Sequence, residues 1–544
     1  MTTELECITI AQAARLIEAK ELSPVELTEA KVALIEGLDG QLNSFVTVTA
    51  DLAMEKAKAA EAEIAAGTYR GPLHGIPFGL KDIYNTAGIL TTAQSKILID
   101  HIPERDATTT AMMHAAGGVL MGKLTTHEFA HGGPSFDLPW PPARNPWNPE
   151  HFTGGSSSGS AAAVAAGLVV GALGSDTGGS VRIPAALTGI AGLKTTNGLV
   201  SRHGVVPNSF TFDTCGPMAW TVEDCAILLQ AIAGYDASDA SSADHPVPDY
   251  RAALTGDVRG LRLGVLRHFW TDNADAETAA AMEAALEVLA GLGAIVEETQ
   301  IRPPQDYYDV KIVIAESELY ATHEKELRAR PGDFGADFLS RAFPACLFRA
   351  VDYIQAQRKQ RRILSEMRSV YAKYDALVTV GAAAPAMRLD AHKMGESWEK
   401  PNVTTPFNVT GGPALVLCNG YSNAGLPLSV QIVGRPFDEA TVLRIGDAYE
   451  RATEWRTRRP ALTLGAPQVP VTPGEAPTTA PGLDAETTDV VEARVARAGL
   501  TLDDGQRARL YAAAPHALAM GRRLRGPRPW EEAPANVFRF PRRV

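Results

Sequence analysis

One stretch, residues 153–193, constrains the fold of this chain more than any other. It contains two clusters rich in glycine and serine, 154–160 and 174–180, joined by the apolar and mostly small residues 161–173. Glycine lets backbone N–H groups approach a ligand closely, and a serine hydroxyl becomes a nucleophile once a base removes its proton. Two such clusters on a short apolar connection predict a site built from hydroxyl groups and backbone donors.

Strand-like and helix-like segments alternate along the chain, which predicts a layered α/β fold. Ser23 and Pro24 are typical of a helix N-cap followed by proline, so two helices should meet there. We expect residues 161–167 to be helical and 132–153 to be irregular. Strands are predicted at 78–84, 118–122, 168–173, 261–266, 295–298, 376–380, 414–417 and 428–433, and further helices at 107–116, 276–292, 350–373 and 438–453.

The C-terminal part differs in composition from the rest. Residues 465–483 are rich in Pro, Ala and Thr and have little to bury, so they predict a linker. Helical periodicity returns after this segment. The chain is therefore divided into a catalytic body, 1–464, a linker, 465–483, and a small helical tail, 484–544.

Charge and cysteine content exclude some classes of protein. The net charge is −12 and the isoelectric point is about 5.6, which argues against a nucleic-acid-binding surface. Five scattered cysteines without CxxC spacing fit a reducing compartment. The N-terminus shows no signal-peptide pattern, and the longest apolar run is shorter than the roughly 20 residues that span a bilayer. We expect a cytoplasmic protein without a membrane segment.

Two short motifs overlap this region and compete with a serine–lysine site. His127–His131 (HEFAH) fits the zinc motif H-E-x-x-H, but Gly132, Gly133 and Pro134 follow at once and would end a helix. We therefore expect a loop with two histidines and no metal site. Residues 155–159 fit the nucleophile elbow G-x-S-x-G, but the residues before them are poor strand formers.

Longer motifs resemble the amidase signature family over roughly residues 5–462. They are GGSSSGS at 154–160, GSDTGGSVRIPA at 174–185, GIPFGLKD at 75–82, NPW at 145–147, GLKT at 192–195, DTCGPM at 213–218 and GLP at 425–427. The resemblance implies a large mixed β-sheet between helices on both faces. It also implies an amidase, a hydrolase of carbon–nitrogen bonds other than peptide bonds, that needs no cofactor.

The family pattern implies a Ser–cisSer–Lys triad. By position, Ser180 is the nucleophile, Ser156 the bridging serine after a cis peptide bond, and Lys81 the base. Lysine acts as a base only when neutral, and burial among apolar neighbours lowers its pKa. Ser158 stands where the family more often has glycine.

The same resemblance assigns supporting roles. The oxyanion would bind the backbone N–H groups of Thr177, Gly178, Gly179 and Ser180. Asp176, Arg182 and Ser157 would hold the surrounding turn. Residues that flank the motifs, and are expected to line the substrate pocket, are Tyr84, Phe129, Gly132, Gly133, Ser135, Phe136 and Phe152; Phe129 fits core packing equally well.

Three hypotheses remain for function. The first is hydrolysis of a small amide, anilide, carbamate or urea-type substrate through an acyl-enzyme. The second is the transferase subunit of a glutamine-dependent tRNA amidotransferase, which shares the same motifs. The third, a catalytically inactive scaffold, is disfavoured by the intact Lys81, Ser156 and Ser180. The tail resembles small helical partner subunits of some amidases, and we expect a homodimer with the tail at its interface.

Overall fold

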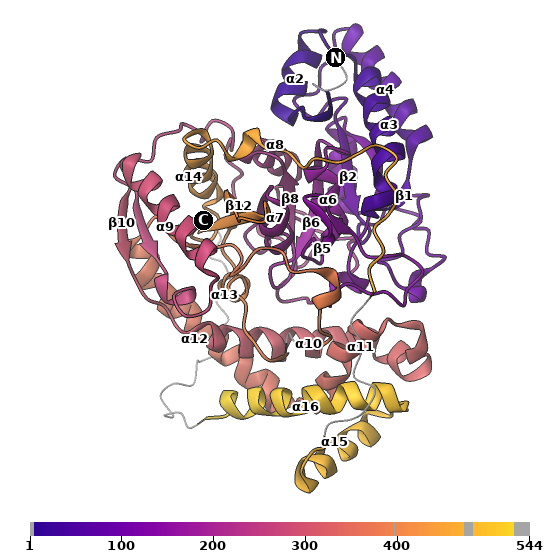
Figure 1. The fold of residues 1–544 in the computed structure, drawn as a ribbon, viewed down its shortest axis with the longest axis vertical. Coiled ribbons are helices and arrows are strands. Elements are labelled where there is room, and N and C mark those ends of the chain that lie inside the picture. The colour runs from indigo at the N-terminus through magenta and orange to yellow at the C-terminus, as the bar shows by residue number, and fades with distance from the viewer. Residues whose placement is uncertain (1–4, 396–397, 473–481, 527–544) are drawn as a thin grey trace.

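One mixed β-sheet of eleven strands runs through the body of the protein (Figure 1). The computed structural model describes residues 5–395, 398–472 and 482–526. In spatial order the strands are β1 (Phe45–Val48), β3 (Val119–Leu124), β2 (Pro77–Lys81), β6 (Gly171–Asp176), β8 (Thr214–Ala219), β7 (Ala191–Lys194), β12 (Ala414–Tyr421), β13 (Pro427–Val433), β11 (Ala376–Val380), β9 (Arg262–Val265) and β10 (Ile295–Glu298). Strands β3, β2 and β6 are parallel neighbours, and the central strands are antiparallel.

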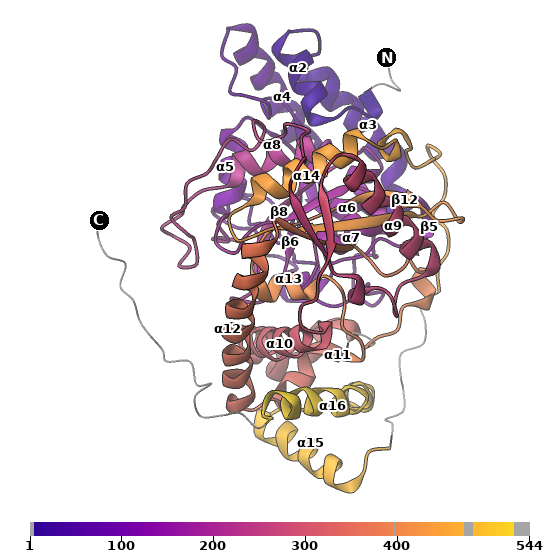
Figure 2. The same cartoon turned by 90° about the vertical axis from the view of Figure 1, so that its left-hand side faces the viewer.

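Helices cover both faces of this sheet, as the resemblance implied (Figures 1 and 2). They include α2 (Ile10–Glu18), α3 (Pro24–Leu42), α4 (Ala50–Ala65), α5 (Thr108–Ala115), α6 (Ser158–Ala165), α7 (Arg182–Thr188), α8 (Val222–Ile232), α9 (Ala276–Gly291) and α14 (Glu439–Arg451). Ser23 caps α3 in a capping box with Glu26 and precedes Pro24 at the first helical position. The predicted junction of two helices is confirmed.

A helical layer lies beyond one end of the sheet (Figure 2). It comprises α10 (Pro304–Ala329), α11 (Ala336–Ala342) and α12 (Ala350–Lys373), with α13 (Thr405–Thr410) packed against α10 and α12. The tail helices α15 (Ala485–Ala498) and α16 (Asp504–Leu524) follow, and α16 packs on α10, α11 and α12 of its own body. Parts of the predicted linker and tail, 473–481 and 527–544, lie outside the described residues.

Two local predictions were wrong. The strand expected at 168–173 is β6, 171–176, because the chain leaves α6 through a turn before it enters the sheet. The second glycine–serine cluster therefore begins inside a buried strand. Residues 132–153 were expected to be irregular, but β4 (Arg144–Asn145) and β5 (Asn148–Phe152) pair there, and the N–H of Phe152 donates to the carbonyl of Met387. None of the described helices is long and apolar enough to cross a membrane.

Candidate active site

The parallel pairing of β2 and β6 brings a lysine and a serine together at the carboxyl ends of the two strands. Leu80 pairs with Leu173, so Lys81, the last residue of β2, and Ser175, near the end of β6, lie on neighbouring strands. The Lys81 ammonium lies 2.9 Å from Ser175 Oγ and 2.7 Å from Ser156 Oγ. The sequence motifs predicted the contact with Ser156, whereas Ser175 was missed. The signal that could have identified Ser175 is its place next to Asp176, directly after a buried apolar run.

Lys81 sits in an environment that favours its neutral form. The side chain is fully buried, and this burial lowers the pKa of Lys81 to about 7, although Asp176 and Asp213 act in the opposite direction. A lysine with this pKa is partly neutral near neutral pH and can then accept a proton.

Ser156 follows a cis peptide bond from Gly155. Its carbonyl accepts a hydrogen bond from the N–H of His127 at 3.0 Å. The next residue, Ser157, donates its N–H to the carbonyl of Ser180 at 3.2 Å and bonds through Oγ to the backbone of Ser175. Ser157 thus ties the two glycine–serine clusters together and holds the backbone of Ser180 next to the residue that follows Ser156.

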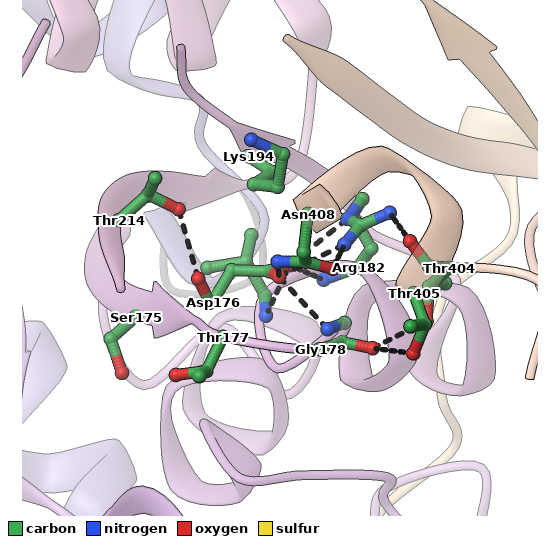
Figure 3. Close-up of polar contacts among 12 residues, drawn as sticks. Ser175, Asp176, Thr177, Gly178, Arg182, Lys194, Thr214, Thr404, Thr405 and Asn408 are labelled. Atoms are coloured by element: carbon green, nitrogen blue, oxygen red, sulfur yellow. Dashed lines mark hydrogen bonds and ion pairs between the residues drawn. The ribbon is translucent and has the colours of Figure 1, made fainter. Parts of the chain in front are cut away.

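A buried ion pair shapes the turn that carries Ser180 (Figure 3). Arg182 holds Asp176 through Nε at 3.0 Å and Nη2 at 2.9 Å, and its other contacts run to Thr404, Asn408 and Gln431. Burial alone would raise the pKa of Asp176, but Arg182 and the Asn408 amide hold it well below its usual range. The carboxylate stays ionised, and its charge-assisted hydrogen bonds fix the turn.

The backbone donors of this turn are divided between two uses. The N–H of Gly179 donates to Asp176 Oδ1 at 2.8 Å, so it is occupied, in contrast to the expectation for an oxyanion site. In the part of the chain that the structure describes, the N–H groups of Thr177, Gly178 and Ser180 have no acceptor. Three of the four expected donors are therefore available to a ligand.

Several residues expected to line the substrate pocket have other positions. Tyr84 is fully buried and donates its hydroxyl to the carbonyl of Gly174 at 2.7 Å, so it supports β6. Phe129 packs against His323, Phe334 and Phe338 in the core. The prediction for Tyr84 is wrong because its side chain points into the interior, whereas Phe129 takes the core position that its sequence context fitted equally well.

The other five residues expected to line the substrate pocket differ in burial and in their contacts. Gly132 accepts a hydrogen bond at its carbonyl from His127 Nδ1, Gly133 donates to Asp337, Ser135 is buried, and Phe136 is half-buried. Phe152 is half-buried and stacks on the rings of His127 and His392. A cavity of about 190 Å³ reaches Ser175, and none of the seven residues lines it; its walls include Ile83, Ala130, Asn208, Phe210, Asp213 and Cys215.

The HEFAH segment forms a turn, as predicted. Its 3-10 helix, η2 (Glu128–Ala130), is too short to present both histidines on one face. His127 bonds to Gly132, whereas His131 lies 3.0 Å from Glu316. Among the described residues no group of three or more His, Cys, Asp or Glu side chains is arranged to hold a metal ion.

Comparison with known proteins shows the family of this chain. The Amidase family model matches residues 26–443. The chain belongs to the amidase signature family. The A-subunit of glutamyl-tRNA(Gln) amidotransferase from Roseiflexus sp. (strain RS-1) is 42% identical over 488 residues, which cover 85% of this chain and 100% of that protein.

Solved structures of this family superimpose well. A chain from the structure "An unexpected vestigial protein complex reveals the evolutionary origins of an s-triazine catabolic enzyme" has 30% identity and a TM-score of 0.77, and covers 82% of this chain and 98% of its own. Native peptide amidase from Stenotrophomonas maltophilia has 31% identity and a TM-score of 0.73, and covers 83% and 98%. This chain is thus an amidase-signature protein of the amide hydrolase and amidotransferase group.

Proposed function

We propose that this amidase-signature protein cleaves an amide C–N bond through an acyl-enzyme on Ser180. One observation carries the proposal: a fully buried Lys81, whose pKa is lowered to about 7, lies 2.7 Å from the hydroxyl of Ser156. The HEFAH segment, by contrast, forms a short turn whose two histidines have different partners.

The proposed reaction begins when neutral Lys81 takes the proton of Ser156 while Ser156 takes that of Ser180. Ser180 Oγ then bonds to the carbonyl carbon, and the resulting oxyanion accepts hydrogen bonds from the N–H groups of Thr177, Gly178 and Ser180. A single donor of this kind contributes roughly 10²–10³ in rate. The C–N bond breaks as the nitrogen takes the proton back from the relay. Water next attacks the ester carbonyl and gives its proton through Ser156 to Lys81. The bond between Ser180 Oγ and the carbonyl carbon then breaks, Ser180 takes the proton back through Ser156, and the acid leaves.

The names of the relatives favour glutamine as the amide. The A-subunits of glutamyl-tRNA(Gln) amidotransferase from several bacteria are 39–42% identical to this chain over nearly their whole length. Our proposal for the specific role is therefore the transferase subunit of a glutamine-dependent tRNA amidotransferase. A protein of this kind works with partner chains.

A specific observation favours the self-contained hydrolase as a second candidate. The tail helix α16 docks on α10, α11 and α12 of its own chain, and its Arg523 pairs with the buried Asp309 at 2.7 Å. A fused helical unit would take the place of a separate small partner subunit. The expected homodimer and cytoplasmic location are further proposals, which light scattering of the purified chain and fractionation of cells would test.

The deciding experiment measures ammonia or amine release by the purified chain from glutamine and from a panel of amides, anilides, carbamates and ureas. Turnover of a panel compound by the chain alone supports the hydrolase. Glutamine cleavage that requires added partner subunits and tRNA supports the transferase. Hydroxylamine should intercept the acyl group as a hydroxamate. Absence of cleavage under every condition, in a folded protein, would exclude the proposed reaction.

A further inference from the structure

A buried cation, Lys311 on helix α10, faces the turn that carries Ser180. Its Cε lies 3.2 Å and its Nζ 3.6 Å from the point that a Cβ on Gly178 would occupy. Lys311 is only 8% exposed. Gly178 also supplies one of the three unoccupied backbone donors, so the ammonium and the proposed oxyanion site are neighbours.

The ammonium of Lys311 lacks the close hydrogen bonds that other buried lysines have. Within the described ranges, the nearest opposite charge to Lys311 Nζ is Glu316 Oε1, at the long distance of 3.7 Å. The other four buried lysines each have an acceptor at 2.7 Å or less; they are Lys31, Lys81, Lys123 and Lys194. A buried ammonium has three N–H groups, and leaving them without close acceptors costs stability.

Glu316 does not supply the missing acceptors, because it is shared. Its other oxygen, Oε2, lies 3.0 Å from His131 Nε2. Burial alone would raise the pKa of Glu316, but His131 and Lys311 hold it below its usual value, so it stays charged. Glu316 offsets the charge of Lys311, but most of the N–H groups of the Lys311 ammonium remain without a close acceptor.

A second incompletely bonded cation, Arg341, lies near enough to Lys311 to interact with it electrostatically. Arg341 of α11 contacts Asp337 at 3.4 Å, and its buried Nε makes no hydrogen bond to any described residue. It is close enough to lower the pKa of Lys311, although burial is the larger cause. Asp337 also accepts the N–H of Gly133 and contacts His392, so it is shared as well.

We propose that Lys311 binds a carboxylate of the substrate, so that this site acts on amides carrying a carboxylate a few bonds from the carbonyl that Ser180 attacks. The inference rests on the proposed function for the position of that carbonyl. A carboxylate accepts several charge-assisted hydrogen bonds, which matches the unused N–H groups of the ammonium. Two kinds of substrate carry such a carboxylate: an α-amino acid amide such as glutamine, and the monoamide of a dicarboxylic acid.

Calorimetric titration tests this directly, since binding needs no turnover. The probes are malonate, succinate, glutarate and L-glutamate, with uncharged succinamide as reference. In the native protein at least one anion should bind at least tenfold more tightly than succinamide. If L-glutamate binds most strongly, the substrate is an α-amino acid amide. If a dicarboxylate binds most strongly, the substrate is the monoamide of a dicarboxylic acid. Equal binding of all anions and succinamide would overturn the inference.

Three variants localise the effect. Lys311→Met keeps the shape without the charge and should weaken anion binding at least tenfold while succinamide is unaffected. Lys325→Gln, at an exposed position on the same helix, should change nothing. Glu316→Gln removes the competing carboxylate and should tighten anion binding, which provides a second test if Lys311→Met misfolds. Unchanged anion binding in both Lys311→Met and Glu316→Gln would refute the role of Lys311.

The two proposals fail in different ways. A chain that binds the anion through Lys311 but cleaves no amide contradicts the proposed function alone. Suppose instead that the chain cleaves neutral and carboxylate-bearing amides with equal kcat/KM, and that Lys311→Met lowers both values equally. This result contradicts only the role of Lys311 in binding a carboxylate.

Discussion

The pKa of Lys81 sets the pH range in which its side chain can accept a proton from Ser156. Burial lowers this pKa from about 10.5 to about 7, so below pH 7 the lysine is charged and cannot act as a base. We expect kcat/KM to rise with pH and to reach half its plateau near pH 7. A pH profile of kcat/KM checks this, and activity that falls as pH increases from 6 to 8 would contradict a lysine base.

Removing the nucleophile should separate chemistry from folding. Ser180→Ala should lower kcat on the order of 10⁴-fold or more, because no acyl-enzyme can form. Ser180 is half-buried, so its loss should leave the melting temperature nearly unchanged. Ser365→Ala on the exposed face of α12 serves as control. Substantial turnover by Ser180→Ala would disprove the assigned nucleophile.

Arg182 supports the fold as well as the site. Arg182→Met leaves the buried Asp176 without its counter-charge, and breaking such a pair costs about 3–5 kcal/mol. We expect a loss of this size in the free energy of unfolding, measured by denaturant titration. Arg259→Met removes an exposed pair with Asp257 and should change stability by less than about 0.5 kcal/mol. Equal effects of the two substitutions would contradict this account.

At the level of elements, the short turn η2 supports the loop that carries Ser156. His127 donates its N–H to Ser156, and its ring lies directly against Gly155. A Cβ on Gly155 would fall 2.0–2.5 Å from three ring atoms of His127. The residues that fit a zinc motif in the sequence thus act as a support for the site.

This close approach leads to a prediction. Gly155→Ala should force the ring of His127 or the loop to move, and a displacement of about 1 Å in a catalytic group costs roughly 10²-fold in rate. We expect kcat/KM to fall by about that factor. Gly40→Ala in helix α3, where a Cβ meets nothing within 4 Å, is the matched control. Full activity of Gly155→Ala would contradict the prediction, because it would show that the His127 ring moves aside without displacing the catalytic groups.

At the level of the whole molecule, the tail and the body share one hydrophobic core. Leu510, Ala514, Ala517, Met520 and Leu524 of α16 are buried together with residues of the body. Arg523 pairs with Asp309, two positions before Lys311 on α10. The tail therefore stabilises the helix from which Lys311 reaches the site.

Truncation after residue 472 should expose this apolar face of α10–α12. Losing several buried side chains at about 1.5–3 kcal/mol each should lower Tm by about 5 °C or more and promote association. Scanning calorimetry and light scattering measure both effects. Asp489→Asn, at an exposed position on α15, is the control and should leave Tm unchanged. A stable, monodisperse chain ending at residue 472 would show that the tail is dispensable.

The sequence by itself determined the fold class, many helix and strand positions and the identity of the family. Helices at 276–292 and 350–373 and strands at 295–298 and 376–380 have periodicities and apolar runs that are local properties of the chain, and they agree with the observed bounds. The contiguous motifs also pointed to Lys81 and Ser156, which the structure brings within 2.7 Å.

Only the tertiary structure decided which groups meet across the chain. It placed Ser175 beside Lys81 and engaged Gly179 with Asp176. It also turned Tyr84 and Phe129 into the core and brought Lys311 to Gly178, although the two residues are more than 130 positions apart in the chain. Such contacts depend on how whole faces of helices and sheets bury one another, and a local pattern does not specify which faces those are.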